Sequence, residues 1–273
     1  MADRFVNKVA LITGGANGLG KSHALGFARE GANVAIADIC KPQRELKYDM
    51  ATTDDMESVL AEIRSLGSDA VGIECDVSRE DDVEKMINRV VEKFGRIDIL
   101  INNAGVASVA VPVWEVKEGI WDLIVDVMLK GTFLCSKYTL PVMIKQKYGK
   151  IVNTSSIGAK GQAGNAPYGA AKAGIESLTV SMAKEVGKYK INVNCVGPGL
   201  VMTSLTRGAL RATSGKNGTP EDQLYAYINK KQSALGEPIT MSDVTNTILF
   251  LCSEDARNIN GSTIYVDGGL LYI

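Results

Sequence analysis

Residues 8–20 read KVALITGGANGLG, and this stretch decides the fold of the chain. Its first five residues are mostly apolar strand formers, the next eight are rich in glycine, and a helical pattern follows through Glu30. A strand, a glycine-rich turn and a helix in this order indicate a phosphate-binding loop. Glycine lets the backbone approach a pyrophosphate closely, and the helix N-terminus supplies N–H donors. The spacing is G-x-x-x-G-x-G rather than the commoner G-x-G-x-x-G.

The second predicted strand, residues 33–37, ends in Asp38. An acidic side chain at this point accepts hydrogen bonds from the adenine ribose hydroxyls, and it repels a 2′-phosphate. The flanking residues Asn17 and Ile39 supply no cation for such a phosphate. The sequence therefore predicts NAD as the cofactor rather than NADP. The alternative is that Asp38 is only a polar strand end.

Strand-like and helix-like segments alternate along the rest of the chain. Further strands are expected at 71–75, 98–101, 150–153, 191–196 and 263–266. Helices are expected at 54–66, 80–93, 119–146, 166–189 and 242–253. We expect Asp54 and Glu57 to cap the first of these, and Gly131 and Pro141 to interrupt the third. This alternation predicts an α/β fold in which residues 1–273 form a single domain around a doubly wound parallel sheet of about seven strands.

Two segments break the alternation. Residues 40–53 are polar and irregular, and we expect a loop that either covers the adenine end of the cofactor or is surface decoration. Residues 202–236 lack strand signals and combine a Gly/Ser/Thr-rich loop with a short helix. An excursion of this kind at the strand ends suits a substrate lid, and solvent-exposed decoration is the alternative.

Polar and small residues follow several predicted strands at the point where each strand ends. They are Asp38, Asp76, Asn103, Ser156 and Pro198. Right-handed crossovers bring the carboxyl ends of parallel strands to one edge of the sheet, where ligands bind at the switch point. We therefore expect these residues to form one composite site.

The stretch 150–175 reads KIVNTSSIGAKGQAGNAPYGAAKAGI and joins a buried strand to a helix. Tyr168 and Lys172 are four residues apart, so they share one helix face, and Ser155 and Ser156 follow the strand. A Y-x-x-x-K spacing alone is more often ordinary helix surface. A phenol has a pKa near ~10, and lowering it to about 7 requires roughly 4 kcal/mol. One ammonium at about 4 Å supplies this only in a partly desolvated site. Tyr168 can then exchange a proton with an alcohol or carbonyl oxygen that Ser156 holds.

The composition excludes several classes of function. The net charge of −1, with dispersed Lys and Arg, gives no basis for a nucleic-acid or membrane partner. The apolar run 9–12 is too short for a signal peptide or a membrane span. The single histidine, His23, rules out a His-rich metal site, and we expect it on a helix face and no metal. Five cysteines without a C-x-x-C pair indicate structural thiols in a reducing, cytoplasmic compartment.

Seven motifs, in this order and spacing, make the chain resemble a classical short-chain dehydrogenase/reductase over nearly its whole length. They are TGGANGLG at 13–20, Asp38, DV at 76–77, NNAG at 102–105, SS at 155–156, YGAAK at 168–172 and PG at 198–199. The resemblance implies a Rossmann fold, a nicotinamide cofactor, hydride transfer and a homotetramer or homodimer.

The resemblance also implies roles for single residues. Tyr168 is expected to be the acid/base, and Lys172 to lower its pKa and bind the nicotinamide ribose, with the oxidised nicotinamide as a second positive charge. Ser156 is expected to orient the substrate oxygen; Ser155 is the lesser candidate, because the family uses the second serine of the pair. The expected cofactor contacts are Gly14, Asn17, Gly18, Leu19, Gly20, Asp38, Ile39, Asp76, Val77, Asn103, Ala104, Gly105, Tyr168, Lys172, Pro198, Gly199, Val201 and Thr203.

One position departs from the family pattern. The family carries a fourth catalytic residue, an asparagine, in a segment like V-N-L-x-G, and residues 127–131 here read VMLKG. Met128 therefore occupies the asparagine position, and a thioether cannot donate a hydrogen bond. The water relay that this asparagine supports is absent here or is carried by backbone carbonyls.

The leading functional hypothesis is an NAD-dependent dehydrogenase of a secondary alcohol or its ketone. The expected substrate-side residues are Ser156, Ile157, Gln162, Met202, Leu205, Leu210, Tyr225 and Trp114. Most are apolar, which favours a cyclic or otherwise hydrophobic alcohol over a sugar. The alternatives are an NADP(H)-dependent carbonyl reductase and a non-catalytic NAD-binding protein, which only Met128 favours.

Overall fold

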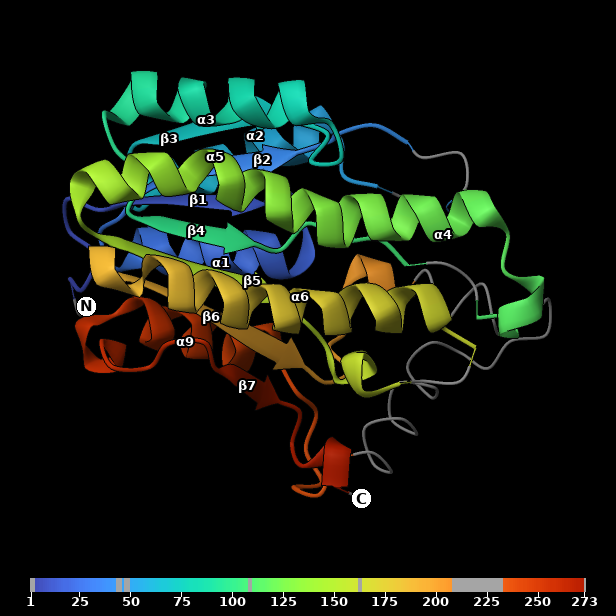
Figure 1. Ribbon diagram of the computed structural model, residues 1–273. Coiled ribbons are helices and arrows are strands. Elements are labelled where there is room, and N and C mark those ends of the chain that lie inside the picture. The colour runs from blue at the N-terminus through green and yellow to red at the C-terminus, as the bar shows by residue number, and fades with distance from the viewer. Residues whose placement is uncertain are drawn as a thin grey trace.

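The computed structural model describes residues 3–42, 46, 50–107, 110–161, 164–207 and 233–272. Its centre is a seven-stranded parallel sheet with the order β3-β2-β1-β4-β5-β6-β7 (Figure 1). The strands are β1 (Val9–Thr13), β2 (Asn33–Asp38), β3 (Ala70–Glu74), β4 (Ile99–Asn102), β5 (Gly149–Thr154), β6 (Ile191–Pro198) and β7 (Thr263–Val266). The predicted doubly wound α/β fold is confirmed, with small shifts at the strand ends.

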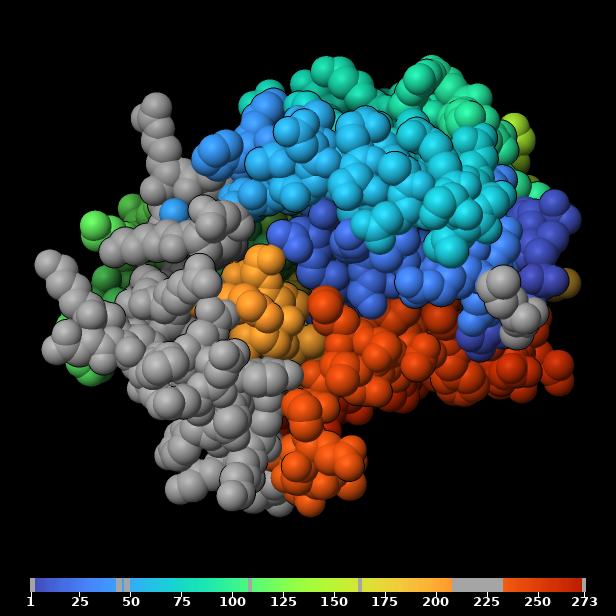
Figure 2. Space-filling model, turned by 180° about the vertical axis from the view of Figure 1, so that it is seen from behind, coloured from blue at the N-terminus to red at the C-terminus, as the bar shows by residue number. Residues whose placement is uncertain are grey.

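Helices cover both faces of the sheet and bury two apolar layers against it (Figure 1). One face carries α1 (Gly18–Arg29), α2 (Thr53–Ser65) and α9 (Met241–Cys252). The other carries α3 (Glu80–Phe94), α5 (Gly131–Gln146) and α6 (Ala166–Val186). Helices α1 and α9 pack together, so the blue N-terminal and red C-terminal parts of the chain lie side by side in Figure 2. The central residues of β1 and β2 are an unbroken apolar run, as expected for a parallel sheet covered on both faces.

Two helix ends show how local sequence sets the boundaries. Gly95 ends α3 with φ 75°, a left-handed conformation that glycine adopts without a Cβ clash. The start of α2 differs from the prediction. Thr52 is the N-cap and forms a reciprocal capping box with Asp55, so the predicted pairing of Asp54 with Glu57 is wrong. The threonine hydroxyl is the better cap, since it both accepts and donates a hydrogen bond here.

The long predicted helix 119–146 is continuous in space but changes geometry. It runs as α4 (Glu118–Val125), one π-helical turn (Asp126–Lys130) and α5 (Figure 1). The change therefore comes just before Gly131, and Pro141 lies inside α5 without ending it. Short 3₁₀ turns occupy Val113–Glu115, Ile157–Lys160, Gly187–Tyr189, Glu254–Ala256 and Leu270–Tyr272.

The order in which strands are added to the sheet reverses at β1, because β2 and β3 lie on one side of it and β4 lies on the other. Strands β1 and β4 are therefore neighbours although they are far apart in sequence. The carboxyl ends of these two strands form the switch point where doubly wound folds bind ligands. Most of the predicted lid lies outside the described residues, as do 43–45 and 47–49 of the predicted loop. Across the described parts of the chain, no helix has the length and apolarity to cross a bilayer.

Candidate functional site

The glycine-rich turn after β1 is shaped by two left-handed glycines, Gly14 with φ 64° and Gly18 with φ 53°. A Cβ at Gly14 would lie 2.9 Å from the Cα of Ala104, so only glycine fits there. Asn17 caps α1 by accepting a 2.7 Å hydrogen bond from the N–H of Gly18. A Cβ at Gly20 would lie 1.9 Å from the carbonyl oxygen of Gly14. Gly20 therefore packs the turn against α1 rather than lining the cavity.

Asp38 ends β2 and is 9% exposed. Its Oδ2 accepts a 3.1 Å hydrogen bond from the N–H of Ala16 in the glycine-rich turn. Burial raises the pKa of this carboxyl group, and hydrogen bonds from backbone N–H groups oppose the increase. Lys41, near this strand end, is already paired with Glu74 at 3.6 Å.

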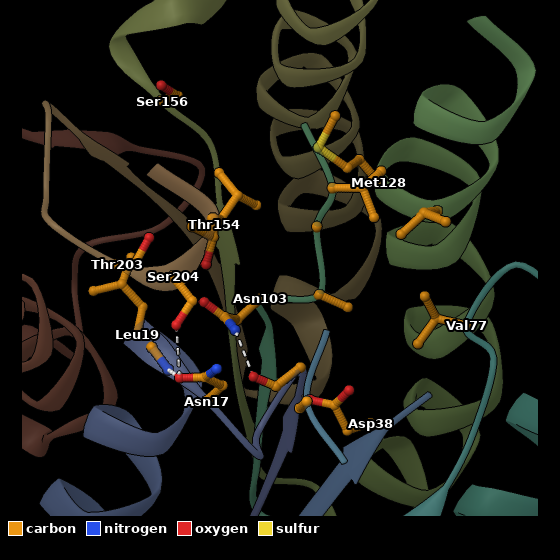
Figure 3. A pocket seen from close by; sticks show the side chains of 18 of the residues that line it. Asn17, Leu19, Asp38, Val77, Asn103, Met128, Thr154, Ser156, Thr203 and Ser204 are labelled. Carbon is orange, nitrogen blue, oxygen red and sulfur yellow. Dashed lines mark hydrogen bonds between the residues drawn. The ribbon is translucent and has the colours of Figure 1, made fainter. Parts of the chain in front are cut away.

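The end of β4 is tied to the glycine-rich turn by Thr13. Its Oγ1 accepts 3.1 Å hydrogen bonds from the N–H groups of Asn103 and Ala104. The amide of Asn103 donates to the carbonyls of Thr13 and Gly14 at 3.0 and 3.2 Å. The two strand ends at the switch point are thereby held as one unit, with Asn103 beside the turn (Figure 3).

A segment from after β6 crosses in front of the glycine-rich turn. Ser204 donates a 3.2 Å hydrogen bond to Oδ1 of Asn17, drawn as a dashed line in Figure 3. A Cβ on Gly18 would lie 3.4 Å from the Cβ of Thr203. The turn and residues 203–206 both line the cavity, and they touch each other at this point.

Tyr168 and Lys172 share one face of α6, as their spacing predicts. Pro167, in the first turn of α6, fits where no intrahelical N–H is needed. Lys172 is 4% exposed, and its Nζ donates a 2.6 Å hydrogen bond to the carbonyl of Thr154 at the end of β5. The same Nζ lies 5.6 Å from the centre of the Tyr168 ring.

The pKa values at this site shift because of burial. Burial lowers the pKa of Lys172 to about 8. Burial also raises the pKa of Tyr168, and a hydrogen bond with the hydroxyl of Ser156 opposes this only in part. Lys172 is not among the groups that shift the pKa of Tyr168 in the chain by itself, and its expected role beside a bound nicotinamide stays a prediction.

Ser156 and the Tyr168 ring lie next to the same residue, Gly158. Ser156 is the N-cap of the 3₁₀ turn Ile157–Lys160, and its Oγ accepts a 3.1 Å hydrogen bond from the N–H of Gly158. Ser155 instead turns away from the phenol and donates a 2.8 Å hydrogen bond to Glu176. Of the serine pair, Ser156 is the one beside Tyr168, as predicted.

Met128 lies in the π-helical turn, is fully buried and lines the cavity (Figure 3). The carbonyl of Met128 accepts a 2.7 Å hydrogen bond from the hydroxyl of Thr132. The side chain lies against Gly105, since a Cβ on that glycine would be 3.6 Å from the sulfur. The position thus presents an apolar thioether to the site.

One cavity collects most of the predicted site residues. These are Gly14, Asn17, Gly18, Leu19, Asp38, Ile39, Asp76, Val77, Asn103, Ala104, Gly105, Ser156, Tyr168, Lys172, Pro198, Gly199, Val201, Thr203 and Leu205. Gly20, Ile157 and Met202 are not among the lining residues, and Trp114 is 82% exposed on the 3₁₀ turn Val113–Glu115, away from it. Gln162, Leu210 and Tyr225 lie outside the described residues.

The structure adds residues that the sequence did not reveal. Thr154 supplies the carbonyl that holds Lys172, and Ser204 bonds to Asn17. Met50 and Ala51, from the end of the irregular loop, also line the cavity. The place of Thr154 at the end of a strand could have indicated its role, but nothing in the sequence marks Ser204.

The residues present fit a dinucleotide. The cavity runs from the glycine-rich turn and Asp38, past the end of β4, to Lys172 and Tyr168. Its turn can lie this close to the end of β4 only because residue 14 is glycine, since a Cβ there would collide with the backbone of Ala104. Among the described residues, no group of His, Cys, Asp and Glu is arranged to hold a metal ion.

Comparisons with known proteins identify the family of the chain. The profile of a family described as enoyl-(acyl carrier protein) reductase matches residues 14–271. A (2S)-[(R)-hydroxy(phenyl)methyl]succinyl-CoA dehydrogenase subunit, BbsD, of Thauera aromatica is 38% identical over 96% of both chains. A 3-oxoacyl-[acyl-carrier-protein] reductase of Staphylococcus epidermidis is 37% identical over 97% of this chain and 99% of its own. The structure of carveol dehydrogenase from Mycobacterium avium in complex with NAD superposes with a TM-score of 0.94 at 32% identity, covering 99% of each chain. The chain belongs to the short-chain dehydrogenase/reductase family of oxidoreductases.

Proposed function

We propose that the protein is an NAD-dependent dehydrogenase that interconverts a secondary alcohol and its ketone. The observation that carries this proposal is the meeting of Ser156, Tyr168 and Lys172 in the same cavity as the glycine-rich turn and Asp38. NAD bound in this cavity would supply the hydride acceptor. The protein's own residues would then supply the proton transfer, the orientation of the substrate and the exclusion of water.

Tyr168 is the proposed acid/base, because its phenol lies beside the Ser156 hydroxyl at the inner end of the cavity. Ser156 holds the substrate oxygen, and its own oxygen is oriented by the N–H of Gly158. Lys172 is held in place by the carbonyl of Thr154, so its ammonium group stays close to the phenol at little entropic cost. With a pKa of about 8, Lys172 is still largely protonated at neutral pH.

NAD is proposed over NADP because of the charges near Asp38. Its carboxylate is buried at the strand end, where a 2′-phosphate would be repelled. Asn17 and Ile39 line the cavity beside it and are uncharged. Lys41, which is paired with Glu74 at 3.6 Å, is not among the residues that line the cavity. The presence of NAD in the complex of the related carveol dehydrogenase supports the same choice.

A cyclic or otherwise hydrophobic alcohol is the proposed substrate class. The residues that line the cavity include Val106, Met128 and Leu205, which offer no charge to a polar substrate. Carveol, the substrate named for one structural relative, belongs to this class. The oxoacyl reductase among the relatives favours a second candidate, an NADP(H)-dependent carbonyl reductase acting on an acyl thioester.

Further parts of the proposal come from the family resemblance and the composition. Residues 1–273 form a single catalytic domain with a lid at about 202–236, and the assembly is a homotetramer or homodimer. The five cysteines are free thiols, which suits a reducing cytoplasmic compartment. A non-catalytic dinucleotide-binding protein is the remaining alternative, and Met128 is the feature that favours it.

The test is a screen of secondary alcohols followed by one substitution. Carveol, cyclohexanol and a 3-hydroxyacyl thioester are incubated with NAD and with NADP, and absorbance of the reduced nicotinamide is recorded. Tyr168→Phe should lower kcat by about 10²- to 10⁴-fold while NAD still binds, because only the transferable proton is lost. Tyr189→Phe is the matched control on the turn after the same helix. Oxidation at the original rate by Tyr168→Phe would refute the mechanism, and preference for NADP would refute the cofactor assignment.

A further inference from the structure

Glu176 lies on α6 four residues after Lys172, so Tyr168, Lys172 and Glu176 follow one another along one helix face. Of these three, Tyr168 and Lys172 line the cavity and Glu176 does not. Its side chain is nevertheless largely buried, with 14% exposed. The mechanism proposed above gives this carboxylate no task.

The carboxylate of Glu176 accepts three hydrogen bonds from three different parts of the chain. Its Oε1 accepts from the hydroxyl of Ser155 at 2.8 Å and from the phenol of Tyr265, on β7, at 2.5 Å. Its Oε2 accepts from Nζ of Lys160 at 2.7 Å. Burial raises the pKa of Glu176, but the hydrogen bonds from Lys160, Tyr265 and Ser155 outweigh it, and the net shift is downward. Glu176 is therefore ionised at neutral pH.

Two of these donors flank Ser156. Ser155 precedes it directly, and Lys160 closes the 3₁₀ turn that Ser156 caps. The backbone of Ser155 is also fixed, since its N–H donates to the carbonyl of Val196 at 2.7 Å. The carboxylate therefore fastens both ends of segment 155–160 to the helix that carries Tyr168.

The bond to Lys160 is the weaker part of this arrangement. The Lys160 side chain is 51% exposed, and ion pairs that reach solvent contribute little. Ser155 is 2% exposed, and besides Glu176 its hydroxyl has one longer contact, at 3.4 Å to the carbonyl of Lys172. Loss of the carboxylate would leave this donor with that weaker contact alone.

We propose that Glu176 is a positioning residue, which holds Ser156 beside Tyr168 by fixing segment 155–160 to α6. The inference rests on the function proposed above. Displacements of about 1 Å at a reacting centre can cost on the order of 100-fold in rate. The expected effect therefore falls on turnover rather than on cofactor binding.

The first test uses Glu176→Ala with the alcohol of the panel that is oxidised fastest, carveol being the first choice. The kcat should fall by about 10- to 100-fold, with the Kd for NAD by calorimetry close to the original value. The melting temperature should fall by several degrees at most, because a buried acceptor is lost. Glu176→Gln keeps an acceptor for Ser155 and Tyr265 and should recover most of the lost turnover. Glu185→Ala, exposed on the same helix, is the control and should change nothing.

The second test asks whether Glu176 acts through Ser156. Adding Glu176→Ala to Ser156→Ala should cost no further turnover, because the positioned group is already gone. The inference would be overturned if kcat in the double variant fell by the product of the two single losses, or if kcat in Glu176→Ala were unchanged. If Glu176→Ala does not fold, Ser155→Ala and Tyr265→Phe, each removing one donor, replace it in the same cycle. Full activity in Tyr168→Phe would refute the proposed function instead, so the two failures are distinguishable.

Discussion

Replacing Asp38 by asparagine isolates the charge at the end of β2. Asp38→Asn keeps an oxygen that can accept from the N–H of Ala16, so the glycine-rich turn should hold its shape. At a separation of about 6 Å and an effective dielectric constant of about 20, two unit charges interact with about 3 kcal/mol. Asp38 is 9% exposed, so solvent screens this repulsion only weakly.

About 1.4 kcal/mol corresponds to a factor of ten. The ratio of kcat/KM with NADP to that with NAD should therefore rise by about 10- to 100-fold in Asp38→Asn. Most of the change should be a tighter Kd for NADP, measured by calorimetry without substrate. The activity with NAD should fall modestly, because an amide oxygen accepts a weaker hydrogen bond from a ribose hydroxyl than a carboxylate does.

Asp69→Asn is the matched control, since it removes the same charge at the other end of the neighbouring strand. It should leave the cofactor ratio unchanged. A ratio in Asp38→Asn within about twofold of the original would mean that Asp38 does not select the cofactor. A large loss of NAD binding together with a lower melting temperature would mean instead that Asp38 mainly holds the turn.

Two further predictions concern buried side chains. Met128→Asn should keep or raise turnover, because it adds a hydrogen-bonding group to the cavity wall; a large loss of kcat at unchanged melting temperature would give Met128 a role of its own. Burial lowers the pKa of His23 to about 3, so as pH falls below about 6.5 the unfolded state takes up a proton that the folded state refuses. The free energy of unfolding should then drop by up to about 1.4 kcal/mol per pH unit between pH 6.5 and 3, measured by urea denaturation. His23→Asn should flatten this dependence between pH 6.5 and 5, and an unchanged slope there would assign it to another group.

The sequence predicted the sheet because its strands are apolar runs bounded by glycine and polar residues. It also predicted the strand-end residues of the cavity, since parallel strands must bring their carboxyl ends together. It could not predict the environment of a side chain that depends on contacts with distant parts of the chain. His23 lies on α1, as a helix-face residue should, but no local pattern indicates that this face is buried against α9, with Nδ1 2.8 Å from the hydroxyl of Thr245.

The other features that the sequence did not predict also depend on contacts between distant parts of the chain. Nothing local to Ser204 indicates that it reaches Asn17, which is 187 residues away in sequence. The three donors to Glu176 come from Ser155 after β5, from the 3₁₀ turn Ile157–Lys160 and from β7, so no spacing rule relates them. Trp114 is a substrate-side candidate in the sequence because it is large and apolar, yet it is exposed. Hydrophobicity alone does not separate a cavity wall from an outer surface.

Burial shifts the pKa values of both Tyr168 and Lys172. We expect the same burial to make proton transfer at the site depend on a bound cofactor. Burial disfavours both the phenolate and the ammonium, so the chain by itself raises the first pKa and lowers the second. The same low dielectric makes an added charge more effective, worth about 4 kcal/mol at 4 Å rather than about 1 in bulk water. We therefore expect Tyr168 to stay protonated near neutral pH until the positive charge of an oxidised nicotinamide adds to that of Lys172. Burial therefore opposes formation of the Tyr168 phenolate in the free chain. We expect proton transfer only in the complex with the oxidised cofactor, where hydride transfer can follow.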